Sequence, residues 1–429
     1  MPLHLTRRRF LQWLGAGLAL GACRRLTPLP FSPLEPAPSP CPSLNPTSTA
    51  TPPGIASPTP SRTPTPTPEP LPPLEMQIGQ MLMVGFRGLR VRADDPLAQA
   101  LQAGQVGMVV LFDLDGPSQG RLPRNIASPE QVQALVADVQ RWAALPVLVT
   151  LDYEGGYVAR LRPQYGFPET ASAMMLGTQG VEATRTQAQA MAQLLRDLGI
   201  RLNLAPVVDL CLNPANPIIA GKERCFSADA EEVSEHARAF IEAHHAAGVA
   251  CTLKHFPGHG SAQGDTHRGW VDVTSCWQPE ELRPYQALIA AGLADAVMVA
   301  HVFHAGLDAQ DPASLSAPII QGLLRQELGF RGLVMSDDLQ MLAIAQNYTL
   351  EEAVRKALLA GVDVLVFANN SADSFDEQLA PRVVALIRRL VETGQVPETC
   401  IAEAYRRVLA FKRTWMPEAF ASLSESVPH

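Results

Sequence analysis

Apolar runs of four to seven residues recur eight times between residues 76 and 418. Runs this short and this apolar are typical of strands that are buried on both faces. They span 81–86, 108–112, 147–151, 202–208, 250–253, 296–300, 332–335 and 362–367. The segments between them include 131–144, 183–198, 230–247 and 350–360, in which apolar residues recur with a helical period. This alternation predicts parallel strands joined by crossover helices, and eight such units predict an α/β fold, a single (β/α)8 barrel of the TIM type.

The N-terminus departs from this pattern. Residues 1–23 combine the basic pair Arg7 and Arg8 with an apolar run at 13–22, which is too short to span a membrane. The Arg pair resembles a twin-arginine export signal. The run ends in LGAC at 20–23, which resembles a lipoprotein cleavage site with Cys23 as the lipidated residue. We expect an exported lipoprotein, anchored to a membrane and acting outside the cytoplasm; the alternative is an uncleaved anchor with an incidental cysteine.

A second segment, 24–75, holds 18 of the 38 prolines, with serine and threonine between them. This composition cannot bury a core, so we expect a disordered linker. At about 3 Å per residue, it could extend to roughly 150 Å. Its expected role is to hold a catalytic domain away from the lipid surface.

The remaining chain divides into a catalytic domain at 76–418 and a short C-terminal tail at 419–429. This length is normal for an α/β barrel, and 47% hydrophobic residues suffice for a large core. The net charge of -8 argues against nucleic acid as a partner, because binding phosphate requires a basic surface. We expect a monomer that uses neither a cofactor nor a metal ion.

The seven cysteines lie at 23, 41, 211, 225, 251, 276 and 400, without a CxxC pair. This spacing is typical of neither a zinc module nor a small disulfide-rich domain. An exported protein can form disulfides, but the spacing assigns none.

Polar residues follow six of the eight runs. They are Asp152, Asp209, Lys254 with His255, His301, Asp337 and Asn369. Barrel enzymes build their active sites from the C-terminal ends of the strands, so this placement predicts an active site there. For Asp209, His301 and Asn369 we prefer a structural role, such as capping the next helix.

The most informative stretch is KHFPGHG at 254–260, followed by DTH at 265–267. It directly follows a predicted buried strand, and its prolines and glycines predict a loop. Titratable side chains on such a loop indicate an active site. The Gly-rich run at 258–264 also leads us to expect a mobile loop without substrate.

Four segments resemble glycoside hydrolase family 3, in its bacterial β-N-acetylhexosaminidase branch. They are the stretch above, DYEGG at 152–156 with Arg160, RCF at 224–226 and SDDL at 336–339. They occur in the family's order and cover essentially the whole predicted domain. The resemblance implies a retaining, exo-acting enzyme that releases terminal N-acetylglucosamine from β-linked glycans such as peptidoglycan or chitin fragments.

The resemblance also implies roles for residues. Asp337 is the nucleophile that forms a covalent glycosyl-enzyme, and His267, oriented by Asp265, is the acid and base. A histidine needs little tuning to cycle between these two roles near neutral pH. The sugar hydroxyls are held by five further residues: Asp152, Arg160, Arg224, Lys254 and His255.

The chain departs from the family pattern at several positions. Tyr153, Tyr157 and Cys225 stand where the family often has Gln, Arg and Ser, and RGW follows His267 in place of an apolar and proline ending. These differences leave the preference for the leaving group open. The chain has no room for the second domain of many family β-glucosidases.

The same residues also permit a different chemistry. His255, His259, Asp265 and His267 could form the metal site of a metal-dependent hydrolase, although a Pro-Gly pair prevents His255 and His259 from sharing a helix face. A family 3 β-glycosidase of different specificity, or a phosphorylase with phosphate as the acceptor, would also fit the motifs. A lipoprotein that only binds cell-wall glycan is a non-enzymatic possibility, but the residues of a complete catalytic site argue against it.

Overall fold

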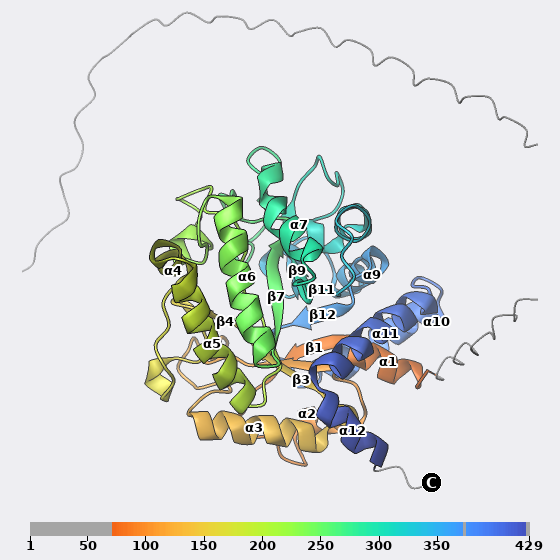
Figure 1. The fold of residues 1–429 in the computed structure, drawn as a ribbon. Coiled ribbons are helices and arrows are strands. Elements are labelled where there is room, and N and C mark those ends of the chain that lie inside the picture. The colour runs from red at the N-terminus through yellow and green to blue at the C-terminus, as the bar shows by residue number, and fades with distance from the viewer. Residues whose placement is uncertain (1–70, 372–374, 426–429) are drawn as a thin grey trace, which may run out of the picture. The chain divides into compact units, whose positions relative to one another are not determined.

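The computed structural model describes residues 71–371 and 375–425 (Figure 1). The predicted export signal, Cys23 and all but the end of the predicted linker lie outside the described residues. The first helix, α1 (Leu74–Gln80), begins just before the predicted domain boundary, and the last, α12 (Pro417–Glu425), extends into the segment predicted as a tail.

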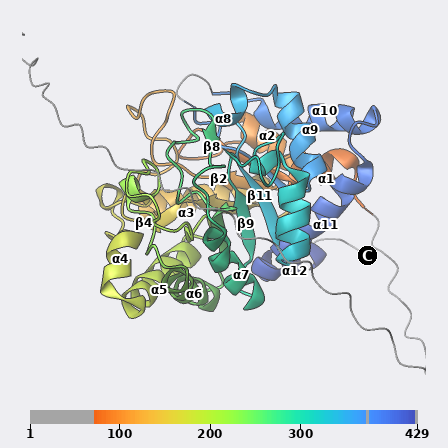
Figure 2. The ribbon, with the colours of Figure 1, turned by 90° about the horizontal axis from the view of Figure 1, so that it is seen from above.

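Eight parallel strands close into a barrel in which strands adjacent along the chain are neighbours, and the last pairs with the first. They are β1 (Leu82–Gly85), β2 (Met108–Val110), β3 (Leu148–Leu151), β6 (Leu202–Asn203), β7 (Ala250–Phe256), β9 (Ala296–Val299), β11 (Leu333–Asp338) and β12 (Val364–Phe367). The view in Figure 2 shows the strands surrounded by helices. The predicted barrel is confirmed, and each predicted run contains part or all of one strand.

Helices connect and cover the strands. Those not yet given are α2 (Pro96–Gln102), α3 (Pro129–Trp142), α4 (Ala173–Gln179), α5 (Val181–Asp197), α6 (Ala230–Ala246), α7 (Arg283–Ala290), the π-helix η5 (Pro318–Glu327), α8 (Leu342–Ala345), α9 (Leu350–Ala360), α10 (Leu379–Glu392) and α11 (Glu398–Trp415). The four predicted helices correspond to α3, α5, α6 and α9. Several begin at a side chain that caps the first turn, such as Ser128 before α3 and Thr349 before α9. Figure 1 shows α1 beside α10 and α11, so helices from near the two ends of the described chain lie together.

The core has two layers. One large cluster fills the space between the strands and the helices, and a second, smaller cluster fills the barrel interior. The inner cluster includes Met83, Met108, Met298 and Met335, and residues of α11 such as Val408 and Phe411 join it. The interior is thus packed with side chains, which leaves the C-terminal ends of the strands as the place for a site.

Two small sheets follow the barrel strands. A hairpin of β4 (Tyr153–Gly155) and β5 (Val158–Ala159) comes directly after β3. A parallel pair of β8 (Val271–Asp272) and β10 (Val302–Phe303) joins the loop after β7 to the segment after β9. Within the described residues, no helix is long and apolar enough to cross a membrane.

Candidate active site

A cavity of about 680 Å³ opens at the C-terminal ends of the barrel strands. Seven of the eight predicted catalytic and substrate-binding residues line it: Asp152, Arg160, Arg224, Lys254, His255, His267 and Asp337. The eighth, Asp265, is hydrogen-bonded to His267. Residues at the C-terminal ends of four strands of the barrel, β3, β6, β7 and β11, or in the loops that follow them, therefore share one site, as the fold predicts.

Asp152 is held between two cations. Its Oδ1 accepts a hydrogen bond from Lys254 Nζ at 2.7 Å, and its Oδ2 accepts one from Arg160 Nη2 at 2.9 Å. Burial raises the pKa of Asp152, but the charges of Lys254 and Arg160 outweigh burial and leave the pKa below its ordinary value. The carboxylate is therefore ionised and fixed where it can accept hydrogen bonds from a sugar.

Glu154, on β4, completes this arrangement and was not among the predicted site residues. Its Oε1 lies 2.6 Å from Lys254 Nζ, and the Arg224 guanidinium donates two hydrogen bonds of 2.8 Å to its carboxylate. Such a fork-shaped pair fixes the plane of the guanidinium. Burial lowers the pKa of Arg224, but Glu154 outweighs burial and raises it overall. The place of Glu154 in the DYEGG motif was the signal that could have identified it.

His255 is oriented from both sides. Its Nδ1 lies 2.7 Å from Asp209 Oδ2, and its Nε2 lies 3.0 Å from Arg224 Nη2. Because a guanidinium only donates, Nε2 accepts and Nδ1 carries the proton. Burial, and then the charges of Arg224 and Lys254, lower the pKa of His255, so the ring is neutral. The Lys254–His255 peptide bond is cis.

Asp209 corrects our prediction of a helix cap. It is buried beneath His255, and its Oδ1 accepts a hydrogen bond from the His259 backbone N–H at 2.8 Å. It therefore supports the site from below. His301 does not cap a helix either, since its Nε2 lies 2.9 Å from the Asp338 carbonyl oxygen and its Nδ1 lies 2.6 Å from Ser314 Oγ.

Asp337 lies near the end of β11, and its Oδ1 accepts a hydrogen bond from the Asp338 backbone N–H at 2.8 Å. Burial raises its pKa, but the neighbouring His301, His255 and His267 outweigh burial and lower it overall. Asp337 is thus an anion facing the cavity. Asp338 also lines the cavity, but its Oδ1 accepts hydrogen bonds from the Gln340 and Ala368 backbone N–H groups.

His267 lies on the loop after β7, and its side chain is 58% exposed. Its Nδ1 lies 2.7 Å from Asp265 Oδ1. Desolvation lowers the pKa of His267, but this hydrogen bond and the charge of Asp337 raise it overall. Asp265, in turn, has a pKa of about 2, because the bond to His267 outweighs the effect of burial. The ring can therefore hold a proton near neutral pH and present Nε2 to a ligand.

The loop that carries this pair has two different halves. Residues 258–262 are buried, and Asn216 donates a 2.7 Å hydrogen bond to the His259 carbonyl oxygen. Residues 263–270 are exposed or half-buried except for Thr266, which is buried and whose carbonyl oxygen accepts a hydrogen bond from the Ala343 N–H. The expectation of mobility is thus confined to the second half of the loop.

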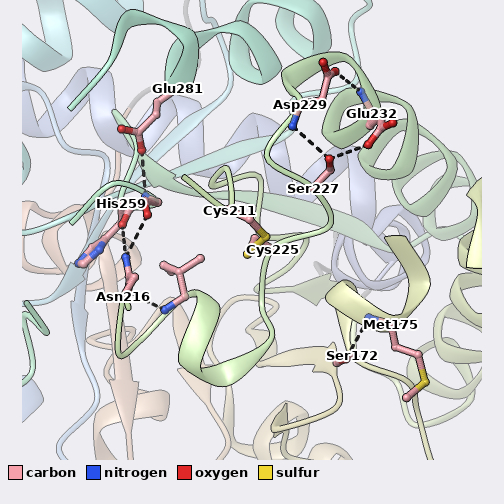
Figure 3. The surroundings of a disulfide bond; sticks show 12 residues. Ser172, Met175, Cys211, Asn216, Cys225, Ser227, Asp229, Glu232, His259 and Glu281 are labelled. Atoms are coloured by element: carbon pink, nitrogen blue, oxygen red, sulfur yellow. Dashed lines mark hydrogen bonds between the residues drawn. A yellow bond between two sulfur atoms is a disulfide. The ribbon is translucent and has the colours of Figure 1, made fainter. Parts of the chain in front are cut away.

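A disulfide joins Cys211 and Cys225 beside the site (Figure 3). Cys211 follows Asp209 by two residues, and Cys225 directly follows Arg224. The bond therefore ties together the two segments that support and contact His255. The sequence alone did not assign this pair, because the two cysteines are brought together only by the folding of the loops after β6.

The metal-site alternative is not favoured by the geometry. His255 is turned toward Asp209 and Arg224, whereas His267 pairs with Asp265. In the part of the chain that the structure describes, no group of three or more His, Cys, Asp or Glu side chains is arranged to hold a metal ion. The four residues of that hypothesis do not form one ligand set.

Comparison with known proteins agrees with this site. Residues 73–411 match the model of the glycosyl hydrolase family 3 N-terminal domain. A protein of Xanthomonas oryzae pv. oryzae named beta-hexosaminidase is 40% identical over 299 residues, which cover 67% of this chain and 83% of that protein. A protein of Idiomarina loihiensis with the same name is 35% identical over 68% of this chain and 84% of its own length.

Solved structures of family 3 enzymes are also similar to this chain. The family 3 beta-N-acetylglucosaminidase of Paenibacillus sp. str. FPU-7 is 34% identical, with a TM-score of 0.72 over 80% of this chain; this chain spans 63% of that protein, less than two thirds. The beta-N-acetylhexosaminidase of Beutenbergia cavernae is 31% identical, with a TM-score of 0.70 over 79% of this chain and 98% of its own. The fold, the cavity and these matches together show that the chain belongs to glycoside hydrolase family 3 and is a glycoside hydrolase.

Proposed function

We propose that this enzyme is a retaining, exo-acting β-N-acetylhexosaminidase that releases terminal N-acetylglucosamine from β-linked glycans such as peptidoglycan or chitin fragments. The observation that carries this proposal is that one cavity is lined by a half-buried anionic carboxylate, Asp337, and by a protonatable imidazole, His267. The names of the relatives, hexosaminidases and N-acetylglucosaminidases, support this substrate class.

In the first step, Asp337 attacks the anomeric carbon and forms a glycosyl ester, while His267 gives its proton to the departing oxygen. In the second step, neutral His267 takes a proton from water as the water attacks the ester, which frees Asp337 and returns the sugar with its configuration retained. Asp265 holds the ring in the orientation that presents Nε2 and stabilises its charged form, as the acidic member of a triad does.

The binding groups suit a polar sugar ring. Asp152 offers acceptors, whereas Arg160, Arg224 and Lys254 offer donors, and ion pairs with Asp152 and Glu154 hold these side chains in place before the sugar arrives. A sugar that leaves water must regain its hydrogen bonds in the pocket. A set of donors and acceptors fixed in advance replaces them at a small entropic cost.

The test is a set of aryl β-glycosides that differ only at C2 of the sugar. We expect kcat/KM for the N-acetylglucosaminide to exceed that for the glucoside by at least about 100-fold, because a site that pairs a substrate's polar group discriminates against its absence. Equal rates, or a preference for the glucoside, would contradict the proposal and favour a family 3 glycosidase of other specificity.

We also propose that the enzyme is exported and held to a membrane by a lipid on Cys23, with residues 24–75 as a spacer. Support comes from the order of Arg7, Arg8, apolar run and LGAC motif in the sequence. The Cys211–Cys225 disulfide is also suited to an oxidising compartment. Replacing Arg7 and Arg8 with Lys should retain the protein in the cytoplasm, and Cys23→Ser should abolish labelling by a fatty-acid probe. Membrane attachment unaffected by Cys23→Ser would overturn the lipid-anchor proposal.

A further inference from the structure

The buried carboxylate of Glu281 lies beneath the loop that carries the acid and base, yet it does not line the catalytic cavity. Glu281 belongs to the short 3-10 helix η3 (Pro279–Leu282), which leads into α7. Its side chain is directed at the backbone of the loop next to His259 (Figure 3). Only 1% of Glu281 is exposed, so its charge must be compensated by the groups that surround it.

Those groups belong mainly to the loop. Glu281 Oε2 accepts hydrogen bonds from the Gly260 N–H at 2.9 Å and from the Ser261 N–H at 3.4 Å. Its Oε1 accepts a 2.6 Å hydrogen bond from Ser261 Oγ. No basic side chain pairs with it among the described residues. Hydrogen bonds to an ionised acceptor are stronger than neutral ones, so these contacts hold the loop tightly.

The backbone of the loop passes very close to Glu281 at Gly258. Gly258 has φ +127°, and a Cβ at this position would lie 2.5 Å from Glu281 Cβ. The close approach therefore requires glycine at 258. From the other side of the loop, Asn216 donates hydrogen bonds to the His259 and Gly260 carbonyl oxygens. Residues 259–261 are thus hydrogen-bonded to Asn216 on one side and to Glu281 on the other. Residue 261 lies four residues before Asp265.

We propose that Glu281 is a positioning residue for catalysis, which holds the first half of the loop so that His267 reaches the departing oxygen of the substrate. This inference rests on the proposed role of His267. A loop fixed at 260–261 has few free residues before the acid, and a displacement of about 1 Å at a reacting group can cost a factor of about 100 in rate.

The positioning role of Glu281 should also make activity depend on pH, because the Glu281 carboxylate can gain a proton. Burial and the charge of Asp209, on the loop after β6, raise the pKa of Glu281 to about 7. Among the described residues, Tyr285 of α7 also interacts with Glu281; burial raises the pKa of Tyr285 well above its ordinary value, so it stays neutral. Below pH 7, Glu281 gains a proton and loses acceptor capacity, and the loop should loosen.

The test compares Glu281→Gln with Glu280→Gln, its exposed neighbour in η3. Glu281→Gln keeps the shape of the side chain but places an NH2 group among backbone donors. We expect kcat/KM for N,N′-diacetylchitobiose, a poor leaving group, to fall by about 10- to 100-fold, and kcat/KM for an activated dinitrophenyl N-acetylglucosaminide to change little. The decline of wild-type activity that begins near pH 7 should be absent in Glu281→Gln, whereas the fall at lower pH, where Asp337 gains a proton, should remain. Glu280→Gln should match wild type.

Two further variants distinguish a failure of the Glu281 proposal from a failure of the proposed function. Ser261→Ala removes one hydrogen bond to Glu281, so its effect should not add to that of Glu281→Gln. It also serves as the test if Glu281→Gln does not fold. His267→Ala is the reference for losing the acid. If His267→Ala slows chitobiose and the dinitrophenyl substrate by the same factor, the proposed function fails. If His267→Ala slows chitobiose more, but Glu281→Gln slows the two substrates equally or slows neither, only the role of Glu281 is overturned.

Discussion

At the scale of single residues, the two reacting groups are kept in opposite charge states by their surroundings. Asp337 is half-buried; burial raises its pKa, but the neighbouring histidines outweigh burial and lower it overall. His267 is on an exposed loop, where Asp265 and Asp337 raise its pKa. Groups whose environments separate their charge states in this way can act as nucleophile and acid at the same pH.

The pH dependence of kcat/KM should reflect the opposite charge states of Asp337 and His267. Glycosylation requires ionised Asp337 and protonated His267, so kcat/KM should fall at low pH as Asp337 gains a proton and at high pH as His267 loses one. Because Asp265 raises the pKa of His267, Asp265→Asn should move the high-pH limb to lower pH. It should also reduce kcat/KM for chitobiose at pH 7 by about 10-fold. A high-pH limb at the same pH in Asp265→Asn would assign that limb to another group.

The sequence predicted the catalytic and sugar-binding residues better than the residues that hold them in place. Asp152, Lys254, His267 and Asp337 lie in motifs at strand ends, where the barrel brings them together. The supporting roles of Asp209 and Glu281 depend on which loops meet in space, and no local pattern specifies that. Asp209 shows the difficulty, because an acid after a strand can cap a helix or support a neighbouring ring, and only the fold decides.

At the scale of secondary-structure elements, strand boundaries were the main deviation from the prediction. We ended the fifth and seventh strands at their last apolar residues, but β7 continues to Phe256 and β11 to Asp338. Both extensions carry polar residues of the site, whose partners in the cavity satisfy them. In these two strands the apolar run therefore marks the apolar part of the strand but misses the polar end that serves function.

The disulfide links two of these elements and should affect binding. Cys211 and Cys225 are 14 residues apart, and closing a loop of about this length contributes about 3 kcal/mol to stability. Because Cys225 adjoins Arg224, we expect a Cys211→Ser, Cys225→Ser double variant to raise KM several-fold with a smaller change in kcat. Its midpoint of thermal unfolding should also fall.

The control for that experiment is Cys400→Ser, which replaces a free cysteine on α11. It should leave KM unchanged. Steady-state kinetics and thermal unfolding of the three proteins provide the measurement. A double variant with wild-type KM would show that the disulfide does not contribute to positioning Arg224.

At the scale of the whole molecule, a buried lysine at the opposite end of the barrel affects stability. Lys412 of α11 is fully buried, and its Nζ donates hydrogen bonds to Gln80 Oε1 and to the Pro146 carbonyl oxygen. Burial lowers its pKa to about 7. The unfolded chain keeps this proton up to a pH near about 10.4, whereas the folded protein releases it near pH 7.

Stability should therefore rise with pH across this window, since the unfolded state binds more protons there. We expect the wild-type free energy of unfolding to increase by a few kcal/mol between about pH 7 and 10, relative to Lys412→Met, which lacks the titrating group. Replacing the exposed Lys222 with Met should preserve the rise. Urea unfolding at several pH values measures it, and parallel curves for wild type and Lys412→Met would contradict the prediction.

The central claim is that Asp337 forms a covalent bond to the sugar, and trapping that bond tests it most directly. A 5-fluoro-N-acetylglucosaminyl fluoride has a good leaving group, while its ring fluorine slows hydrolysis of the ester, so the intermediate should accumulate. Mass spectrometry of the digested enzyme should locate one sugar on the peptide that contains Asp337, and Asp337→Asn should remain unlabelled. A label on Asp338 or any other residue, or turnover of the reagent without a labelled peptide, would contradict the account.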